Sequence, residues 1–220
     1  MPEALGNGDV RAVVLVEGVS DRAALDVLAR RRGMDLAGAG IAIVSMDGIT
    51  NVGHFLDHYC VPGRGVRVAG LYDDAEERFV RRGLVRVGLG AGAGAGPGAG
   101  DAAGAGPLPR AELEALGFYA CSPDLEDELI RALGPSAVVE LVEAAGDLRS
   151  FRTLQRQPAQ RTRSLHDQLR RLMSGRSGGK ERYAAAMAAA VALERVPRPL
   201  SAVLAHVDAA LGGFPADSER

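Results

Sequence analysis

The chain has 220 residues, of which 47% are hydrophobic and 25% charged, a balance that allows a buried core and excludes a wholly disordered polypeptide. The formal net charge is −2, so binding to nucleic acid would have to come from a local concentration of basic residues. The two cysteines form no CxxC pair, which excludes a disulfide framework and argues against a zinc module.

Three short apolar segments in the first third of the chain predict strands of a parallel sheet. Residues 10–16 (VRAVVLV), 41–45 and 66–71 are rich in β-branched side chains and have the length of strands buried on both faces. Helices are predicted between them, one starting from an N-cap at Ser20 and one from Asn51. Strands that alternate with helices at this spacing indicate right-handed parallel crossovers.

Residues 88–107 consist mainly of Gly-Ala pairs with prolines, and we expect them to form a flexible surface insertion. After it, residues 117–121 (GFYAC) predict a fourth strand. The rest of the chain has the apolar spacing of helices, over residues 125–133, 136–145, 164–173, 180–193 and 199–211. We therefore expect a Rossmann-like α/β domain over residues 1–122, with a parallel sheet of about four strands flanked by helices. A helical C-terminal part is expected over residues 123–220.

Acidic residues follow three of the four predicted strands. Ligands of parallel α/β sheets bind beyond the carboxyl ends of the strands, so these side chains are expected to converge. Converging carboxylates repel one another unless a cation lies between them, and oxygen ligands of this kind prefer Mg²⁺ or Mn²⁺. The acids at such positions are Glu17, Asp21, Asp73, Asp74, Glu76, Glu77, Asp124, Glu126, Asp127 and Glu128.

Most of these acids, taken singly, also have a simpler explanation. Asp21 and Asp124 are placed where a carboxylate favours a helix N-terminus, and Glu76 can pair with an arginine one helical turn later. Glu17 lacks such an explanation, because it ends a buried strand where a carboxylate has no packing role. The predicted metal site therefore depends on the acids occurring together.

Charge is segregated in the second half of the chain. Residues 110–147 contain nine acidic and two basic residues, whereas residues 149–182 contain ten basic and two acidic ones. The basic segment suits contacts to phosphates, or else forms a solvated helical face or pairs with the acidic stretch before it. The candidate phosphate-binding residues are Arg152, Arg156, Arg161, Arg163, Arg170 and Arg171.

Residues 14–21 (VLVEGVSD) resemble the opening motif of a toprim domain, the catalytic fold of type IA and type II topoisomerases, bacterial primases and several nucleases. The EGxSD form of the motif is most similar to that of the overcoming lysogenization defect (OLD) nucleases. Residues 43–52, 72–76 and 124–129 are similar to later parts of the same pattern. The resemblance covers about residues 10–180 without the Gly-Ala insertion, and it implies a toprim fold for this part of the chain.

The resemblance implies Mg²⁺ or Mn²⁺ ligands at Glu17, Asp21 and Asp73, of which Glu17 and Asp73 would also be catalytic. It implies further ligands among a second group of acids, Asp74, Glu76, Asp124 and Glu126. Lys180 is similar to a late lysine of the family and would stabilise charge on the reacting phosphate. It is also the only lysine in a chain with 26 basic residues.

The third acidic motif departs from the Asp-x-Asp pair of the family. If Asp73 is the first acid of the pair, the second position is Ala75. If the register moves by one residue, Asp74 and Glu76 form an Asp-x-Glu pair. Either register alters the acidic site, so the number of metal ions, one or two, stays open.

The resemblance implies metal-dependent hydrolysis of phosphodiester bonds in DNA, with the arginines holding the flanking phosphates. Two alternatives remain open. One is a degenerate toprim module that is not catalytic and binds nucleic acid or a partner ATPase. The other is a toprim ribonuclease that acts on structured RNA.

Nucleases of this family usually carry an ATPase domain, and we expect this chain to be free-standing and to work with a separate ATPase subunit. Residues 175–180 (GRSGGK) are one residue short of a P-loop, and Glu181 replaces the Ser or Thr that would hold Mg²⁺. The sequence has no apolar run approaching ~18 residues and no basic segment followed by an apolar one at its start. We therefore expect a cytoplasmic location and no membrane contact.

Overall fold

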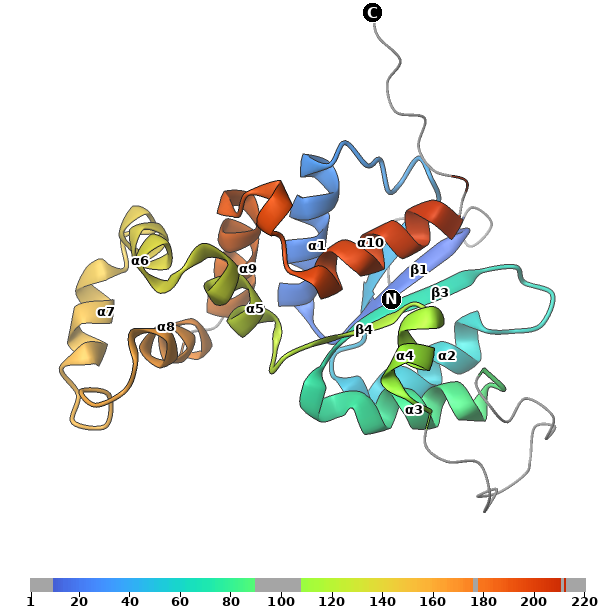
Figure 1. Ribbon diagram of the computed structural model, residues 1–220, viewed down its shortest axis with the longest axis horizontal. Helices are drawn as coiled ribbons and strands as arrows, with labels where there is room; N and C mark the ends of the chain where they lie inside the picture. Colours follow the sequence, from blue (N-terminus) through green and yellow to red (C-terminus); the bar gives the residue numbers. More distant parts are fainter. Residues whose placement is uncertain (1–9, 90–107, 176–177, 211, 213–220) are drawn as a thin grey trace, which may run out of the picture.

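The computed structural model describes residues 10–89, 108–175, 178–210 and 212 (Figure 1). Its centre is a four-stranded sheet in the order β2-β1-β3-β4, in which all three neighbouring pairs are parallel. The strands are β1 (Ala12–Val16), β2 (Ile41–Ser45), β3 (Arg67–Asp73) and β4 (Phe118–Cys121). The predicted α/β fold with about four parallel strands is confirmed. Most of the predicted Gly-Ala insertion, residues 90–107, lies outside the described residues.

The strand order reverses direction between β1 and β3. Val14 of β1 pairs with Ile43 of β2 on one side and with Ala69 of β3 on the other. The chain therefore leaves the end of β1 toward one edge of the sheet and returns to build the other. Ligand sites of open α/β sheets lie at such a reversal, beyond the carboxyl ends of the two strands.

Helices cover both faces of the sheet, which explains why β1 is apolar at every position. Ala12, Val14 and Val16 belong to one buried cluster with α1 (Val19–Arg31), and Val13 and Leu15 belong to a second cluster on the other face. The first cluster also includes α9 (Gly179–Ala190) and α10 (Arg198–Ala210). The second cluster includes residues of α2 (Val52–Tyr59), α3 (Glu77–Arg86) and α4 (Arg110–Ala115).

The remaining helices extend sideways from the sheet (Figure 1). After β4, α5 (Leu125–Leu133) leads into what we call the helical arm, made of α6 (Pro135–Ala144), α7 (Leu148–Gln155) and α8 (Leu165–Ser174). The helices of the arm pack on one another through buried side chains that include Val142, Phe151 and Leu169. The chain then returns, and α9 packs along α1 while α10 packs on β3 and β4. The limit between the two parts at residue 122 stays a prediction.

Three helices of the structure were not among the predicted elements: α3, α4 and α7. In α3 and α7 arginines and other polar residues outnumber the apolar ones, so the sequence shows no clear helical pattern there although one face of each helix is buried.

The predicted N-cap at Ser20 is wrong, because α1 begins at Val19 with Gly18 as its N-cap. The Gly18 N–H donates to the carboxylate of Asp21 (2.9 Å). Three short 3-10 helices complete the described elements: η1 (Ile49–Asn51), η2 (Asp74–Glu76) and η3 (Leu193–Arg195).

Arg31 of α1 closes the C-terminal end of α9, and replacing it with methionine is expected to destabilise the fold. Its Nη1 donates to the carbonyl oxygens of Ala188 (2.7 Å) and Val191 (2.6 Å), which have no partner within their own helix. Losing both bonds is worth about 1–3 kcal/mol, or a fall in Tm of roughly 3–8 °C, measured by circular dichroism. The control is Arg30→Met, since exposed Arg30 donates to the Asp26 carbonyl oxygen of its own helix and to no other element among residues with a described position. Equal falls in the two variants would contradict this role.

Candidate metal centre

Two carboxylates follow the two central strands at the reversal of strand order. Glu17 comes directly after β1, and Asp73 is the last residue of β3; both side chains are half-buried. The Oε2 atom of Glu17 is buried and has no hydrogen-bond partner among the described residues. An acceptor left in this state is costly in a folded protein, so it points to a partner that the protein itself does not supply.

Asp21 is the third acid of this group and reaches it from the first turn of α1. Its side chain is buried and accepts the Gly18 N–H described above. The pKa of Asp21 is raised to about 7, mainly by burial and in part by the nearby charges of Glu126 and Glu17, while the hydrogen bond from Gly18 opposes the change. The resemblance to an EGxSD motif therefore corresponds to a defined geometry, in which the second acid is fixed by the backbone that carries the first.

The carboxylates of the group act on one another across the edge of the sheet. The pKa of Asp73 is raised to about 8, mainly by burial and in part by the charges of Glu17, Asp21, Asp124 and Glu126. Burial also raises the pKa of Glu17, and among the neighbouring acids the charge of Glu76 makes the largest contribution. Mutual repulsion of this kind is expected where carboxylates converge without a cation between them.

Two acids of α5 complete the group, and each has a basic partner. Asp124 is the N-cap of α5, where it accepts the Asp127 N–H (2.9 Å) and forms an ion pair with Arg170 of α8. Glu126 is buried, and its Oε1 lies 3.3 Å from the Nζ of Lys180 on α9. Lys180 and Arg170 are thus the basic side chains beside these two acids; the role of Lys180 on the substrate phosphate stays a prediction.

The environment of Lys180 keeps its ammonium group charged. Burial lowers the pKa of Lys180, but the carboxylates of Glu126, Asp124 and Asp73 raise it by more, so the net shift is upward. At neutral pH the lysine is therefore a positive charge beside an acidic group. Its position fits a role in neutralising the acids or in contacting an anionic substrate.

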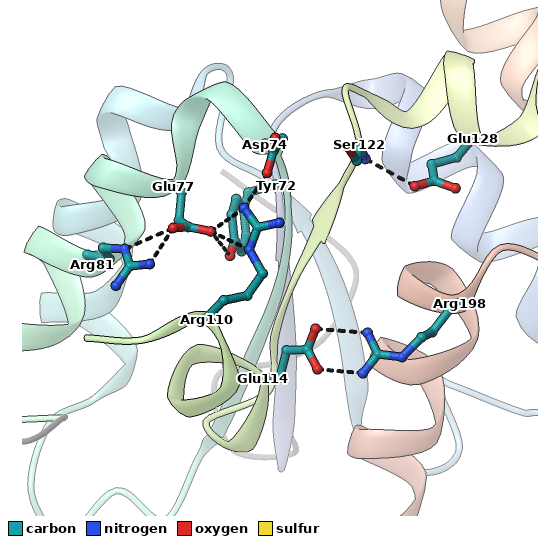
Figure 2. A network of polar contacts seen from close by, with 9 residues as sticks. All are labelled: Tyr72, Asp74, Glu77, Arg81, Arg110, Glu114, Ser122, Glu128 and Arg198. Carbon is teal, nitrogen blue, oxygen red and sulfur yellow. Dashed lines mark hydrogen bonds and ion pairs between the residues drawn. The ribbon is translucent and has the colours of Figure 1, made fainter. Parts of the chain in front are cut away.

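The altered third motif divides its acids between two environments. Asp74, in η2, forms an ion pair with Arg110, which also donates through its Nε to Glu77 (2.6 Å). Figure 2 shows Arg110 between these two carboxylates, with Arg81 on the other side of Glu77. Glu76 instead acts on Glu17, as the pKa of Glu17 shows. The sequence left two registers open; Glu76 raises the pKa of Glu17 and Glu17 raises that of Asp73, whereas Asp74 is paired with Arg110.

Several contacts around these acids were not predicted, although Glu128 is one of the acids that follow the fourth predicted strand. Arg110 holds Asp74, and Glu128 accepts the Ser122 N–H (3.0 Å) in the turn between β4 and α5 (Figure 2). No local pattern could have found the contact of Arg110, because the Gly-Ala segment separates it from Asp74 in the sequence. His166 of α8 lies 2.7 Å from Asp127 and fastens α8 to α5 in the same way as Arg170 does.

The structure separates the six candidate phosphate-binding arginines. Arg170 is half-buried and forms an ion pair with Asp124, so it links the helical arm to α5. The other five are exposed, on α7, on α8 and in the loop between them: Arg152, Arg156, Arg161, Arg163 and Arg171. The arm thus has a basic surface formed by these five arginines, whereas Arg170 is paired with an acid.

The acidic group fits a divalent cation of the Mg²⁺ class. In the part of the chain that the structure describes, no three acidic, histidine or cysteine side chains lie close enough to form a ready-made metal cage. Mg²⁺ does not require one, because it keeps several waters and is usually held by one or two carboxylates together with substrate phosphates. The unpartnered Oε2 of Glu17 and the raised pKa of Asp73 are the observations that match such an ion. Over the same described residues, no helix is long and apolar enough to cross a membrane.

Comparison with known proteins agrees with this geometry. Residues 10–73 match the family described as the overcoming lysogenization defect protein-like TOPRIM domain. The fold is similar to the C-terminal region of the OLD protein of Xanthomonas campestris pv. campestris, with a TM-score of 0.67 and 25% identity over 92% of this chain and 94% of that one. The C-terminal region of the Burkholderia pseudomallei OLD protein gives a TM-score of 0.63 and 20% identity over 92% and 99%.

A search of curated proteins found no match to the chain. The predicted resemblance to the toprim region of OLD proteins is confirmed. The structural similarity extends beyond the matched residues to the helical C-terminal part, because it covers nearly the whole of both chains. A toprim domain of this kind implies a metal-binding function connected with nucleic acids.

Proposed function

We propose that this chain is a metal-dependent endonuclease that hydrolyses phosphodiester bonds of DNA. The observation that carries the proposal is the group of carboxylates at the reversal of strand order, where Glu17 has a buried oxygen that no described residue contacts by a hydrogen bond. A buried acceptor and several acids with raised pKa are unfavourable in a domain that has only to fold. They are expected where a fold serves to bind a cation.

The ligand set that we propose has two direct ligands. Glu17 and Asp73 would hold the ion, and Asp21, which the Gly18 N–H orients, would act on it through one of the bound waters. Glu126, with Asp124, would hold a second ion if there is one. A bound Mg²⁺ or Mn²⁺ would supply an activated water and neutralise charge on the phosphate. We do not include Asp74, because Arg110 holds it.

Lys180 is proposed to contact the substrate phosphate. Its ammonium group lies beside Glu126, at the border of the acidic group, and its side chain remains 55% exposed. It can therefore reach an incoming anion without first being desolvated. A positive charge at this place stabilises the additional negative charge that develops on a phosphate during displacement.

One observation favours the alternative of a binding module without catalysis. Arg110 neutralises Asp74, and the second position after Asp73 is Ala75, so the third motif has fewer free acids than an Asp-x-Asp pair. A toprim ribonuclease would use the same residues, and phosphate contacts do not distinguish DNA from RNA. A cytoplasmic location and a separate ATPase subunit stay predictions from the sequence.

The proposal is tested by incubating the purified protein with supercoiled plasmid in Mg²⁺ or Mn²⁺, beside structured RNA and beside an EDTA control. We expect nicking of the plasmid that requires the metal and stops in EDTA. Cleavage of RNA alone would establish the ribonuclease instead. If neither substrate is cut although calorimetry detects metal binding, the chain is a binding module.

A further inference from the structure

A row of arginines on α7 has no part in the acidic centre. Arg149, Arg152 and Arg156 line an open hollow of about 640 Å³ together with Leu148 and Gln155. We propose that this row, the α7 arginine face, is a docking site for the sugar-phosphate backbone of nucleic acid. The inference rests on the proposed function for its substrate class, but it concerns binding at a place distinct from the site of hydrolysis.

The spacing of the three arginines places them on one side of the helix. Positions i, i+3 and i+7 lie within one stripe of an α-helix, and over this length the helix rises ~10 Å. The opposite side of α7 is apolar: Phe151 is buried in the core of the arm and Leu154 is packed against it. The fold of the arm therefore fixes the direction in which the arginines point, away from α6 and α8.

The charges of the α7 arginine face are not neutralised within the described part of the protein. Other basic residues nearby have carboxylate partners, as in the ion pairs of Arg131 with Glu128 and of Arg182 with Asp147. Arg149, Arg152 and Arg156 are exposed and form no ion pair among the described residues. Like charges one helical turn apart destabilise a helix slightly, so their grouping favours an anionic partner.

The size of the row favours a polymer of phosphates over a single anion. Duplex DNA carries one phosphate per 3.4 Å of axis on each strand, so a stripe of ~10 Å faces about three successive phosphates. Guanidinium groups bind phosphate oxygens in a bidentate manner and do so without reading the bases. In addition, α7 packs on α6 and α8, at the end of the arm away from the sheet (Figure 1). Docking there would hold the nucleic acid at a distance from the acids.

The test measures binding of a fluorescein-labelled 30-base-pair DNA duplex by anisotropy in EDTA, where no metal-dependent chemistry occurs. The variant is Arg149→Gln, Arg152→Gln and Arg156→Gln combined. The control combines Arg11→Gln, Arg82→Gln and Arg195→Gln, which removes the same charge from exposed positions outside the arm. Circular dichroism confirms that both variants fold. We expect the α7 variant to bind the duplex at least about tenfold more weakly. The negative slope of log K against log salt should become less steep by about 3. The control should stay within about threefold of the wild type.

Each other outcome overturns the inference. Equal losses in the two variants would show a general effect of charge, and unchanged binding by the α7 variant, or no binding by the wild type, would show that the row does not dock nucleic acid. The proposed function fails separately. If the wild type nicks no plasmid and still binds the duplex through α7, the docking site stands without the nuclease. Nicking without α7-dependent binding supports the nuclease alone.

Discussion

Replacing Glu17 by glutamine is expected to abolish metal-dependent nicking of plasmid DNA. Glutamine has nearly the same shape but carries no charge, so the buried position beside β1 stays filled while the ligand is lost. A metal ion contributes several kcal/mol of stabilisation in the transition state, and losing about 4 kcal/mol lowers a rate roughly a thousandfold. The measurement is the initial rate of conversion from supercoiled to open-circular plasmid in Mg²⁺ and in Mn²⁺.

The experiment needs a control for charge and a second readout. Glu143→Gln removes one exposed carboxylate from α6, far along the chain from the acids, and should nick at the wild-type rate. Calorimetry with Mn²⁺ should show weaker binding to Glu17→Gln and unchanged binding to Glu143→Gln. Cleavage that survives in Glu17→Gln would identify a contaminant or a different catalytic centre. The ligand set given above would then be wrong.

The position of the acidic centre could be predicted from the sequence because it depends on topology. Once residues 10–16 and 66–71 are recognised as parallel strands, the acids that follow them must meet at one edge of the sheet. Glu17 and Asp73 were found in this way, and the structure brings them into the same electrostatic environment. The chemistry at this edge follows from local patterns, so it needed no knowledge of distant contacts.

The partners of the acids could not be predicted, because they come from far along the chain. Arg110 reaches Asp74 across 36 positions and Arg170 reaches Asp124 across 46. In a chain rich in arginine, no single arginine is marked by its sequence as the partner of an acid. Arg170 was therefore assigned to phosphate binding together with its neighbours. The structure shows that it fastens α8 to α5.

In the helical part, too, some elements could be predicted from the sequence and others could not. The bounds of α5 were predicted correctly, because its apolar residues keep helical spacing and Asp124 caps its first turn. In α7 the same burial is achieved by Phe151 with few other apolar residues, and the charge pattern hid the helix. The helices α9 and α10 return to cover the sheet because their apolar surfaces match it. A local sequence pattern does not reveal such a match.

Replacing Asp73 by asparagine is expected to stabilise the metal-free protein at alkaline pH while it removes the catalytic function. In EDTA the pKa of Asp73 is about 8, above its ordinary value of 3.8, so the folded state holds a proton that the unfolded state has lost. Stability from this group is present at low pH and is lost as the pH rises through about 8. Between pH 7 and pH 9 the wild type should lose about 1 kcal/mol, or roughly 2–4 °C in Tm.

Asp73→Asn should have a higher Tm than the wild type at pH 9 in EDTA and a flatter dependence on pH, because it carries no charge to desolvate. Asp74→Asn is the matched control: Asp74 is 40% exposed and paired with Arg110, so its loss should leave Tm unchanged or lower it slightly. Added Mn²⁺ should raise the Tm of the wild type and not that of Asp73→Asn. A residue kept for folding alone would not show this combination. If Asp73→Asn instead melts lower than the wild type at pH 9, the carboxylate serves the fold, and the proposed centre loses its second ligand.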